Sequence, residues 1–136
     1  MHAEHTNRAC VRPGILKGEG DKMPKLGTRK HLLVTKELER ALPPLYANEE
    51  KAATDVKIVV KFFSPYSGAT WYATEYSPEE RLFFGYAELF PGEGELGYFS
   101  LDELEKVTVF GGVPAIERDC YFGDHNLKEV LDGARP

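Results

Sequence analysis

The sequence VKIVVKFFSPYSGATWYATEYSPEERLFFGYAELFPGEGELGYF, residues 56–99, decides the fold. It contains four stretches rich in β-branched and aromatic residues, separated by three short segments of turn-forming residues. Strands are expected at residues 56–63, 70–76, 81–90 and 95–99. Because the turns are short, consecutive strands pair with one another, which predicts a four-strand antiparallel meander.

Two helix signals flank the meander. Before it, Thr35 is placed to cap a short helix that ends at the Pro43-Pro44 pair. After it, Ser100 and Glu103 form a capping box, in which the hydroxyl and the carboxylate each satisfy a free backbone N–H of the first turn. A second helix is therefore expected directly after the meander.

The last part of the chain predicts one more strand and one more helix. Residues 115–122 alternate like a strand, and residues 126–131 form a short helix that Gly133 stops. This order favours an α+β fold with a mostly antiparallel sheet, made of the four-strand meander plus one later strand. Two or three short helices are expected on one face of that sheet.

Length and composition fit one soluble domain with its own core. The chain has 136 residues, of which 42% are hydrophobic and 29% are charged. A domain of this size buries roughly 68% of the surface that its unfolded chain exposes. No apolar stretch approaches the ~18 residues that a membrane span requires, so the sequence predicts no membrane partner.

The charge is divided unequally along the chain. Residues 1–30 carry seven Lys or Arg and three acids, a net charge of +4, whereas residues 31–136 carry ten bases and nineteen acids, a net charge of −9. The first segment is rich in glycine and lacks apolar periodicity, which predicts a basic, disordered tail ahead of a single acidic domain at residues 31–136. Because nucleic-acid affinity comes mainly from Lys and Arg, the acidic domain is a poor candidate for binding DNA or RNA.

The tail has more than one interpretation. It lacks the uninterrupted apolar stretch of about 7 to 15 residues that a secretory signal needs. The favoured interpretation is an irregular extension, or an overlong translation start ahead of Met23. The other is a basic arm that makes weak contact with nucleic acid.

The two cysteines, Cys10 and Cys120, form no disulfide framework in the sequence and have no partner at metal-ligand spacing. A reducing, cytoplasmic location is therefore expected. Cys120 and His125 have the composition of a nucleophile and a base. We expect instead a half-buried cysteine on a strand and a solvated histidine in the following turn.

Seven segments carry a resemblance to a known family over residues about 32 to 124. The chain resembles the bacterial domain-of-unknown-function family numbered two-nine-five-eight, whose members are often labelled plasmid-related proteins. The resemblance implies a location on plasmids and integrative elements, with no established activity or catalytic residues. The segments are Leu33-Val34-Thr35-Lys36-Glu37-Leu38, Leu42-Pro43-Pro44-Leu45-Tyr46, Val60-Lys61-Phe62-Phe63-Ser64-Pro65, Thr70-Trp71-Tyr72-Ala73-Thr74-Glu75, Phe83-Phe84-Gly85, Glu95-Leu96-Gly97-Tyr98-Phe99-Ser100-Leu101-Asp102-Glu103-Leu104-Glu105 and Ile116-Glu117-Arg118-Asp119.

Two sets of side chains are candidates for a functional site. Carboxylates on the predicted strands could act as catalytic groups of a hydrolase if a cleft holds two of them at a set separation. Otherwise they form a solvated acidic face of the sheet. Aromatic rings serve to stack on bases or to bind a protein. Because Trp71 and Tyr72 alternate, one of their two rows is expected on the surface. The candidates are Tyr66, Trp71, Tyr72, Glu75, Glu88, Glu117 and Asp119.

The leading hypothesis is a non-enzymatic accessory protein of a mobile genetic element. It acts in the cytoplasm by binding a protein with a basic surface, against a host defence system or in maintenance of the element. The alternative is a small hydrolase or nucleic-acid-processing enzyme that uses the four candidate carboxylates. Neither hypothesis includes a cofactor or a metal ion. A concave pocket that gathers three of the carboxylates favours the enzyme, and a convex acidic face favours binding.

Overall fold

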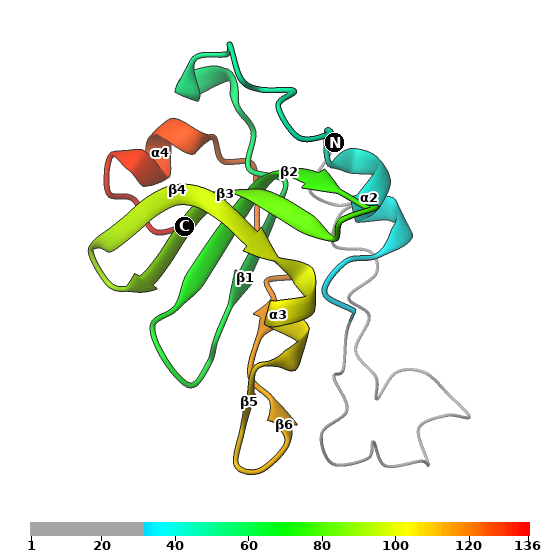
Figure 1. Ribbon diagram of the computed structural model, residues 1–136. Coiled ribbons are helices and arrows are strands. Elements are labelled where there is room, and N and C mark those ends of the chain that lie inside the picture. The colour runs from blue at the N-terminus through cyan, green and yellow to red at the C-terminus, as the bar shows by residue number, and fades with distance from the viewer. Residues whose placement is uncertain (1–31) are drawn as a thin grey trace.

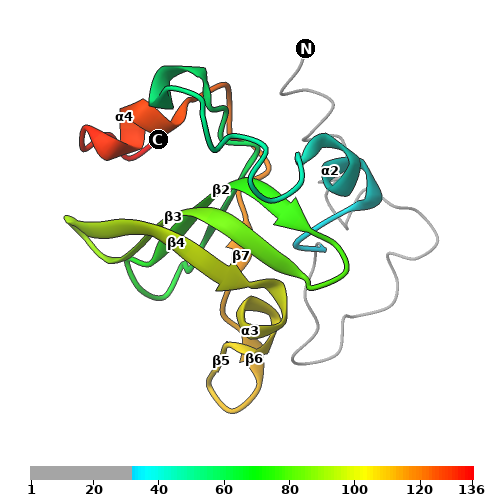
Figure 2. The ribbon, with the colours of Figure 1, turned by 45° about the horizontal axis from the view of Figure 1, so that its top comes forward.

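The computed structural model describes residues 32–136, and the expected tail at residues 1–30 lies outside this range. Five strands form an antiparallel sheet in the order β4-β3-β2-β1-β7. Figure 1 labels β1 to β4, and Figure 2 labels β7. The strands are β1 (Val60–Phe63), β2 (Thr70–Ser77), β3 (Leu82–Phe90), β4 (Glu93–Ser100) and β7 (Glu117–Arg118). The predicted α+β fold, with a four-strand meander plus one later strand, is therefore confirmed.

The remaining elements are short. A two-stranded hairpin of β5 (Thr108–Val109) and β6 (Val113–Pro114) projects from the sheet below α3 (Figure 1). The helices are α2 (Lys36–Ala41), the 3₁₀ helix η3 (Ala53–Asp55), α3 (Leu101–Lys106) and α4 (Leu127–Leu131). None of the helices within residues 32–136 is long and apolar enough to cross a membrane.

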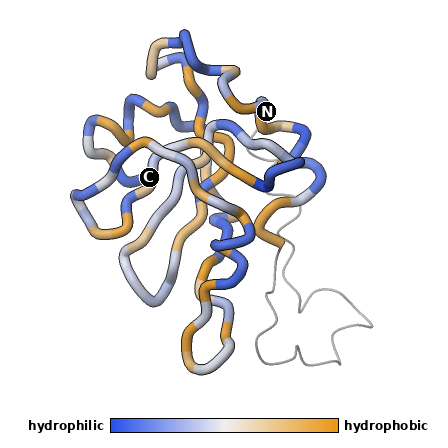
Figure 3. Tube along the Cα trace, in the orientation of Figure 1, coloured by the Kyte–Doolittle hydropathy of each residue, from blue (hydrophilic) through white to orange (hydrophobic). Residues whose placement is uncertain are grey.

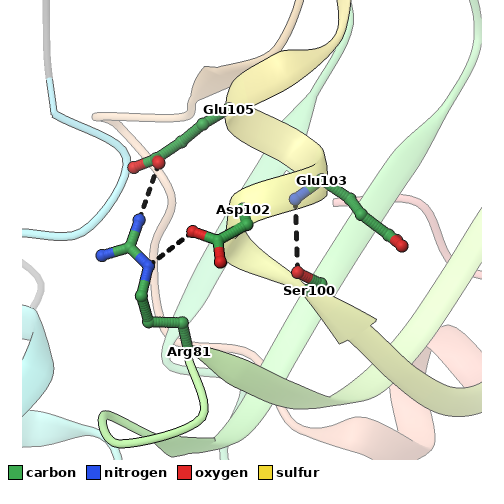
Figure 4. A network of polar contacts seen from close by, with 5 residues as sticks. All are labelled: Arg81, Ser100, Asp102, Glu103 and Glu105. Atoms are coloured by element: carbon green, nitrogen blue, oxygen red, sulfur yellow. Dashed lines mark hydrogen bonds and ion pairs between the residues drawn. The ribbon is translucent and has the colours of Figure 1, made fainter.

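Side-chain caps start the helices at the residues that the sequence indicates. The Thr35 hydroxyl accepts a hydrogen bond from Leu38 N at 3.1 Å, and the Ser100 hydroxyl accepts one from Glu103 N at 3.2 Å. Only this half of the predicted capping box is present at α3, because the Glu103 carboxylate points away from Ser100 (Figure 4). A complete capping box stands instead at α4, between Asn126 and Glu129.

Arg81 fastens the β2–β3 turn to α3. Its Nε lies 2.7 Å from Asp102 Oδ1, and its Nη2 lies 2.6 Å from Glu105 Oε1 (Figure 4). A backbone hydrogen bond joins the same two segments, since Leu101 N donates to Arg81 O at 2.9 Å. The start of α3 is thereby fixed at the end of β4.

Two strands are shorter than predicted. Residues 56–58 leave the sheet and pair with the segment before α4: Ile58 N donates to His125 O, and Leu127 N donates to Val56 O. β1 therefore begins only at Val60. The strand predicted at residues 115–122 is reduced to the two residues of β7, which pair with Phe62 and Phe63 of β1.

Helices cover both faces of the sheet, which differs from the single covered face that the sequence suggests. One core cluster joins α2 and α3 to β1–β4, and a second joins α4 to the opposite face; in Figure 2, α4 lies apart from α2 and α3. Along the helices, hydrophilic and hydrophobic positions mix, as expected where one side faces a sheet (Figure 3). The first cluster includes Leu38, Phe62, Trp71, Phe83 and Leu104, and the second includes Ile58, Tyr72, Phe122, Leu127 and Val130.

Two features of the sheet bear on the site. A β-bulge interrupts the pairing of β2 with β3 between Ala73 and Glu75. Next to it, the backbone of Gly85 comes so close to β2 that a Cβ atom would lie 1.9 Å from the carbonyl oxygen of Tyr72. The bulge turns Glu75 onto the face of Tyr72, beside Phe84, its partner in β3.

Arg118 of β7 is buried, and no acidic partner contacts it within residues 32–136. Its Nε donates to Leu32 O at 3.1 Å, while Nη1 and Nη2 have no hydrogen-bond partner among the residues described. Burial lowers the pKa of the guanidinium from its usual value. The side chain therefore ties β7 to the start of the described chain through a single hydrogen bond.

Candidate binding surface

Glu75 is buried and holds the loop that follows α2. Its two carboxylate oxygens accept hydrogen bonds from Tyr46 N at 2.8 Å and from Asn48 N at 2.9 Å. Tyr46 has a φ of 73°, a left-handed conformation that is uncommon for a bulky residue. Hydrogen bonds to a charged acceptor are stronger than neutral ones, so Glu75 stabilises this unusual turn.

Glu88 is also buried, and it closes the β3–β4 hairpin. Its Oε2 accepts a hydrogen bond from Gly92 N at 2.7 Å, and its Oε1 lies 3.4 Å from Arg135 Nε. Tyr72 lies near it on the same face of the sheet and is 1% exposed. Burial, with the negative charge of Glu88, raises the pKa of Tyr72 to about 12.

The pKa of Tyr72 predicts a loss of stability at high pH. The native state holds the phenolic proton more tightly than the unfolded chain, whose tyrosines have a pKa of about 10. This contribution is fully present below pH ~10 and is lost as the pH rises toward ~12, to a total on the order of 2 to 3 kcal/mol. Urea unfolding at several values from pH ~9 to ~12 measures it.

Tyr72→Phe removes this titration, so the fall in unfolding free energy above pH ~10 should become shallower. Tyr121→Phe is the matched control, because Tyr121 is 78% exposed. An alkaline slope that is the same in wild type and Tyr72→Phe would contradict the prediction.

Asp119 and Glu117 lie on the segment of β7, and within residues 32–136 a side-chain contact is seen for Asp119. Asp119 Oδ2 lies 3.6 Å from Lys61 Nζ, and Asp119 Oδ1 accepts a hydrogen bond from Tyr121 N at 2.9 Å. Lys61 Nζ also donates to Pro136 O at 2.6 Å. Glu117 is exposed. These contacts fix the last residues of the chain against β1.

The candidate aromatic residues divide into buried and exposed groups. Trp71 and Tyr72 are 9% and 1% exposed, so the surface row expected from their alternation is absent at both positions. Tyr66 is exposed and packs edge-on against Phe110, with 5.4 Å between ring centroids. Phe110 has a φ of 52° and marks the hydrophobic tip of the β5–β6 hairpin (Figure 3).

His125 has a hydrogen-bond partner in α4. Its Nδ1 lies 2.8 Å from Glu129 Oε1, and its ring packs against Phe122 at 4.9 Å. This hydrogen bond lowers the pKa of Glu129. Cys120 is buried, whereas His125 lines a shallow pocket of about 250 Å³ without it. The imidazole of His125 is therefore engaged by Glu129.

β4 forms an edge of the sheet, since among residues 32–136 it pairs only with β3. Leu101 N bonds to Arg81 O in register with the β3–β4 ladder. Antiparallel hydrogen bonds alternate from pair to pair, so every second residue of β4 presents its N–H and C=O away from β3. These residues are Gly94, Leu96, Tyr98 and Ser100.

A pocket adjoins this edge on each face of the sheet. On the face of Glu75, a pocket of about 430 Å³ lies between the loop after α2, α4 and the side chains of Leu96 and Tyr98. On the other face, a pocket of about 410 Å³ is lined by Gly97, Phe99 and residues of α3. We call β4 with these two pockets the β4 edge, and name the pockets the Tyr98 pocket and the Gly97 pocket.

Exposed apolar side chains and carboxylates line the β4 edge. Leu96 is 44% exposed and Tyr98 is 51% exposed. A side-chain hydrogen bond with Tyr46 raises the pKa of Tyr98, and both tyrosines line the Tyr98 pocket. Glu95 and Glu103 line the Gly97 pocket, whose lining within residues 32–136 includes no lysine or arginine.

Of the seven candidate residues, Glu75 lines the Tyr98 pocket and Trp71 lines the Gly97 pocket. Glu88 and Asp119 lie near Tyr72 but are each engaged by a cation, and Tyr66 lies at the β1–β2 turn. The interpretation of single residues missed Leu96, Glu95 and Glu103. The available signal was the meander itself, because its first and last strands each have a side that no other strand of the meander covers.

Comparison with curated proteins and with solved structures finds no match to this chain. A family model described as "Protein of unknown function (DUF2958)" matches residues 32–135. The match confirms the resemblance noted over residues about 32 to 124 and extends it almost to the last residue. The chain therefore belongs to this family of proteins of unknown function.

Proposed function

We propose that this protein is a non-enzymatic accessory protein of a mobile genetic element that acts in the cytoplasm by binding another protein, a component of a host defence system. The observation that carries the proposal is the β4 edge. Exposed apolar groups beside concave, partly apolar pockets are typical of protein-binding surfaces. Leu96 and Tyr98 supply such groups, and an unpaired strand supplies backbone donors and acceptors next to them.

The charge of the domain supports a partner with a basic surface. Residues 31–136 have a net charge of −9. A field of this sign attracts cationic proteins, repels nucleic acid and accelerates association at low salt. Salt should therefore slow the association, because the Debye length falls from about 10 Å at 0.1 M to about 3 Å at 1 M.

The alternative function as a hydrolase has less support in the geometry. Glu75, Glu88 and Asp119 each bind backbone N–H groups, and the last two also contact a cation. Only Glu75 of the four candidate carboxylates lines either pocket of the β4 edge. Within residues 32–136, no three His, Cys, Asp or Glu side chains group closely enough to hold a metal ion.

Affinity purification from cells that carry the element tests the proposal. We expect the wild type to retain a protein that the Tyr98→Asp variant loses. Tyr121→Asp is the matched control, because Tyr121 is also exposed but lies outside the β4 edge, and it should retain the same protein. The interaction should then be reproduced with the purified partner, with an association rate that falls as salt rises.

Two results would contradict the proposal. One is a set of captured proteins that is identical for wild type and Tyr98→Asp. The other is a hydrolytic activity that copurifies with the wild type and disappears in Glu88→Gln, because that result would favour the enzyme.

A further inference from the structure

We infer that the partner adds a β-strand to the free edge of β4, and that this strand alternates apolar residues with lysine or arginine. The inference rests on the proposed protein-binding function and specifies its contact. In strand addition, backbone hydrogen bonds supply affinity, and pockets for alternate side chains supply specificity. The β4 edge has both features.

The backbone of β4 is ready to pair. Its outward residues include Leu96 and Tyr98, and each non-proline residue of a strand offers one donor and one acceptor. β4 spans Glu93–Ser100, a length at which strands pair stably in sheets. An extended segment placed beside it would continue the ladder beyond β3 and β4.

The pockets lie where the side chains of an added strand would point. Paired residues on neighbouring strands project to the same face. Residues opposite Leu96 and Tyr98 would therefore pack on the side of the Tyr98 pocket, where these two side chains are exposed. Residues opposite Glu95 and Gly97 would project over the Gly97 pocket. Alternate side chains thus enter two different pockets.

The charges determine which alternate positions are basic. Glu95 and Glu103 line the Gly97 pocket, and among the described residues no lysine or arginine of its lining balances them. The absence of a side chain at Gly97 leaves room beside Phe99 for the aliphatic stem of a lysine or arginine, whose charged end then reaches the carboxylates. The Tyr98 pocket is also lined by two carboxylates, but Glu75 is bound by two backbone N–H groups and Lys51 lines the pocket together with Glu49. Its apolar lining of Leu96, Phe84 and Leu131 therefore assigns apolar residues to the positions over it.

A second copy of the chain does not supply this pattern. The strand it offers at the corresponding edge is β4 itself, which carries Glu93 and Glu95 and no lysine or arginine. Pairing two copies would bring four carboxylates to one seam, where like charges are destabilising. The occupant we propose is therefore a different protein with a basic, alternating segment.

A pair of variants at Leu96 isolates the backbone contribution. Leu96→Ala removes the side chain, whereas Leu96→Pro removes the side chain and the outward N–H. Proline is tolerated on an edge strand where the N–H faces solvent. The probe is a labelled peptide of about nine residues that alternates valine and lysine, and fluorescence anisotropy with the full chain gives its dissociation constant.

We expect Leu96→Ala to weaken peptide binding by a few-fold and Leu96→Pro to weaken it by about tenfold more, the change expected for a lost backbone hydrogen bond and the steric block. Thermal unfolding of both variants is the control and should show that each variant keeps its fold. A peptide of the same composition in two blocks, and one that alternates valine and glutamate, should bind at least about tenfold more weakly.

Gly97→Val tests the Gly97 pocket separately. A Cβ at this position meets no atom of residues 32–136 within 4 Å, so the fold should be kept while the valine occupies the space for a basic side chain. Gly123→Val is the matched control outside the β4 edge, where the nearest atom to a Cβ is His125 Nε2 at 3.8 Å. We expect weaker peptide binding only for Gly97→Val.

Several results would overturn the inference. One is that Leu96→Ala and Leu96→Pro bind the alternating peptide with equal affinity. Another is that the alternating and block peptides bind the wild type with equal affinity. The third is that the wild type sediments as a dimer and the Leu96→Pro variant as a monomer. The purified partner separates this inference from the proposed function. If the partner binds and Leu96→Pro does not weaken it, protein binding stands and strand addition fails. If neither a protein nor the peptide binds, both fail.

Discussion

Gly85→Val is expected to unfold the domain or to lower its free energy of unfolding by about 3 kcal/mol or more. The Cβ would lie 1.9 Å from the carbonyl oxygen of Tyr72 and 2.9 Å from its carbonyl carbon. Both are backbone atoms of the neighbouring strand, so no side-chain rotation relieves the clash. β2 and β3 would have to separate at the centre of the sheet. Denaturant unfolding followed by circular dichroism measures the effect.

Gly97→Val is the control for this experiment, because Gly97 is the residue of β4 that pairs with Gly85. The same substitution across the same pair should leave the unfolding midpoint almost unchanged, since its Cβ enters open space. Equal destabilisation by the two variants would show that the loss comes from replacing glycine in a strand rather than from the contact with Tyr72.

Glu75→Ala is expected to lower the free energy of unfolding by about 2 to 4 kcal/mol. It removes the acceptor for two backbone N–H groups, those of Tyr46 and Asn48, and leaves the left-handed turn at Tyr46 without its anchor. Chemical denaturation gives the stability. Hydrogen exchange at the two N–H groups should accelerate more than exchange in β3.

Glu75→Gln separates a structural from a catalytic role for this carboxylate. The amide keeps one oxygen acceptor, so we expect a destabilisation smaller than that of Glu75→Ala. A structural role predicts that partner binding follows the stability of the two variants. If the wild type had a hydrolytic activity that Glu75→Gln lacked, and the two proteins were equally stable, Glu75 would be catalytic and the proposed function would be wrong.

Local sequence signals were sufficient for the meander. The turns at Ser64–Gly68, Ser77–Glu80 and Pro91–Gly94 fall between stretches of strand-forming residues, and β2, β3 and β4 follow within a few residues of the expected bounds. Hairpins depend on contacts between neighbours in sequence. The order and pairing of the strands in the meander can therefore be predicted from the sequence alone.

The position of Glu75 could not be predicted in the same way. Strict alternation places Glu75 on the face of Trp71 and Ala73, in the apolar core. The bulge after Ala73 adds a residue and reverses the face, which brings Glu75 to the Tyr98 pocket. No residue type in this segment signals a bulge, because the cause is a tertiary one: the loop after α2 offers two N–H groups to the carboxylate.

The second covered face was missed for a related reason. α4 has five residues, too few for a clear apolar period, and its contact with Tyr72 depends on residues 56–58, which leave the sheet to pair beside it. The capping box of Asn126 and Glu129 was readable and marks the start of α4. Which face the helix covers is a long-range property that no local pattern contains.

β7 covers the edge of β1 with more than its two paired residues. Asp119 N donates to Lys61 O at 2.9 Å, and Asp119 Oδ2 lies 3.6 Å from Lys61 Nζ. The flanking residues Ile116 and Cys120 are buried, so the cover is anchored in the core on both sides of β7. An exposed strand edge is a site at which another chain can pair. Within residues 32–136 the sheet is therefore protected from such pairing at β1 and open to it along the whole length of β4.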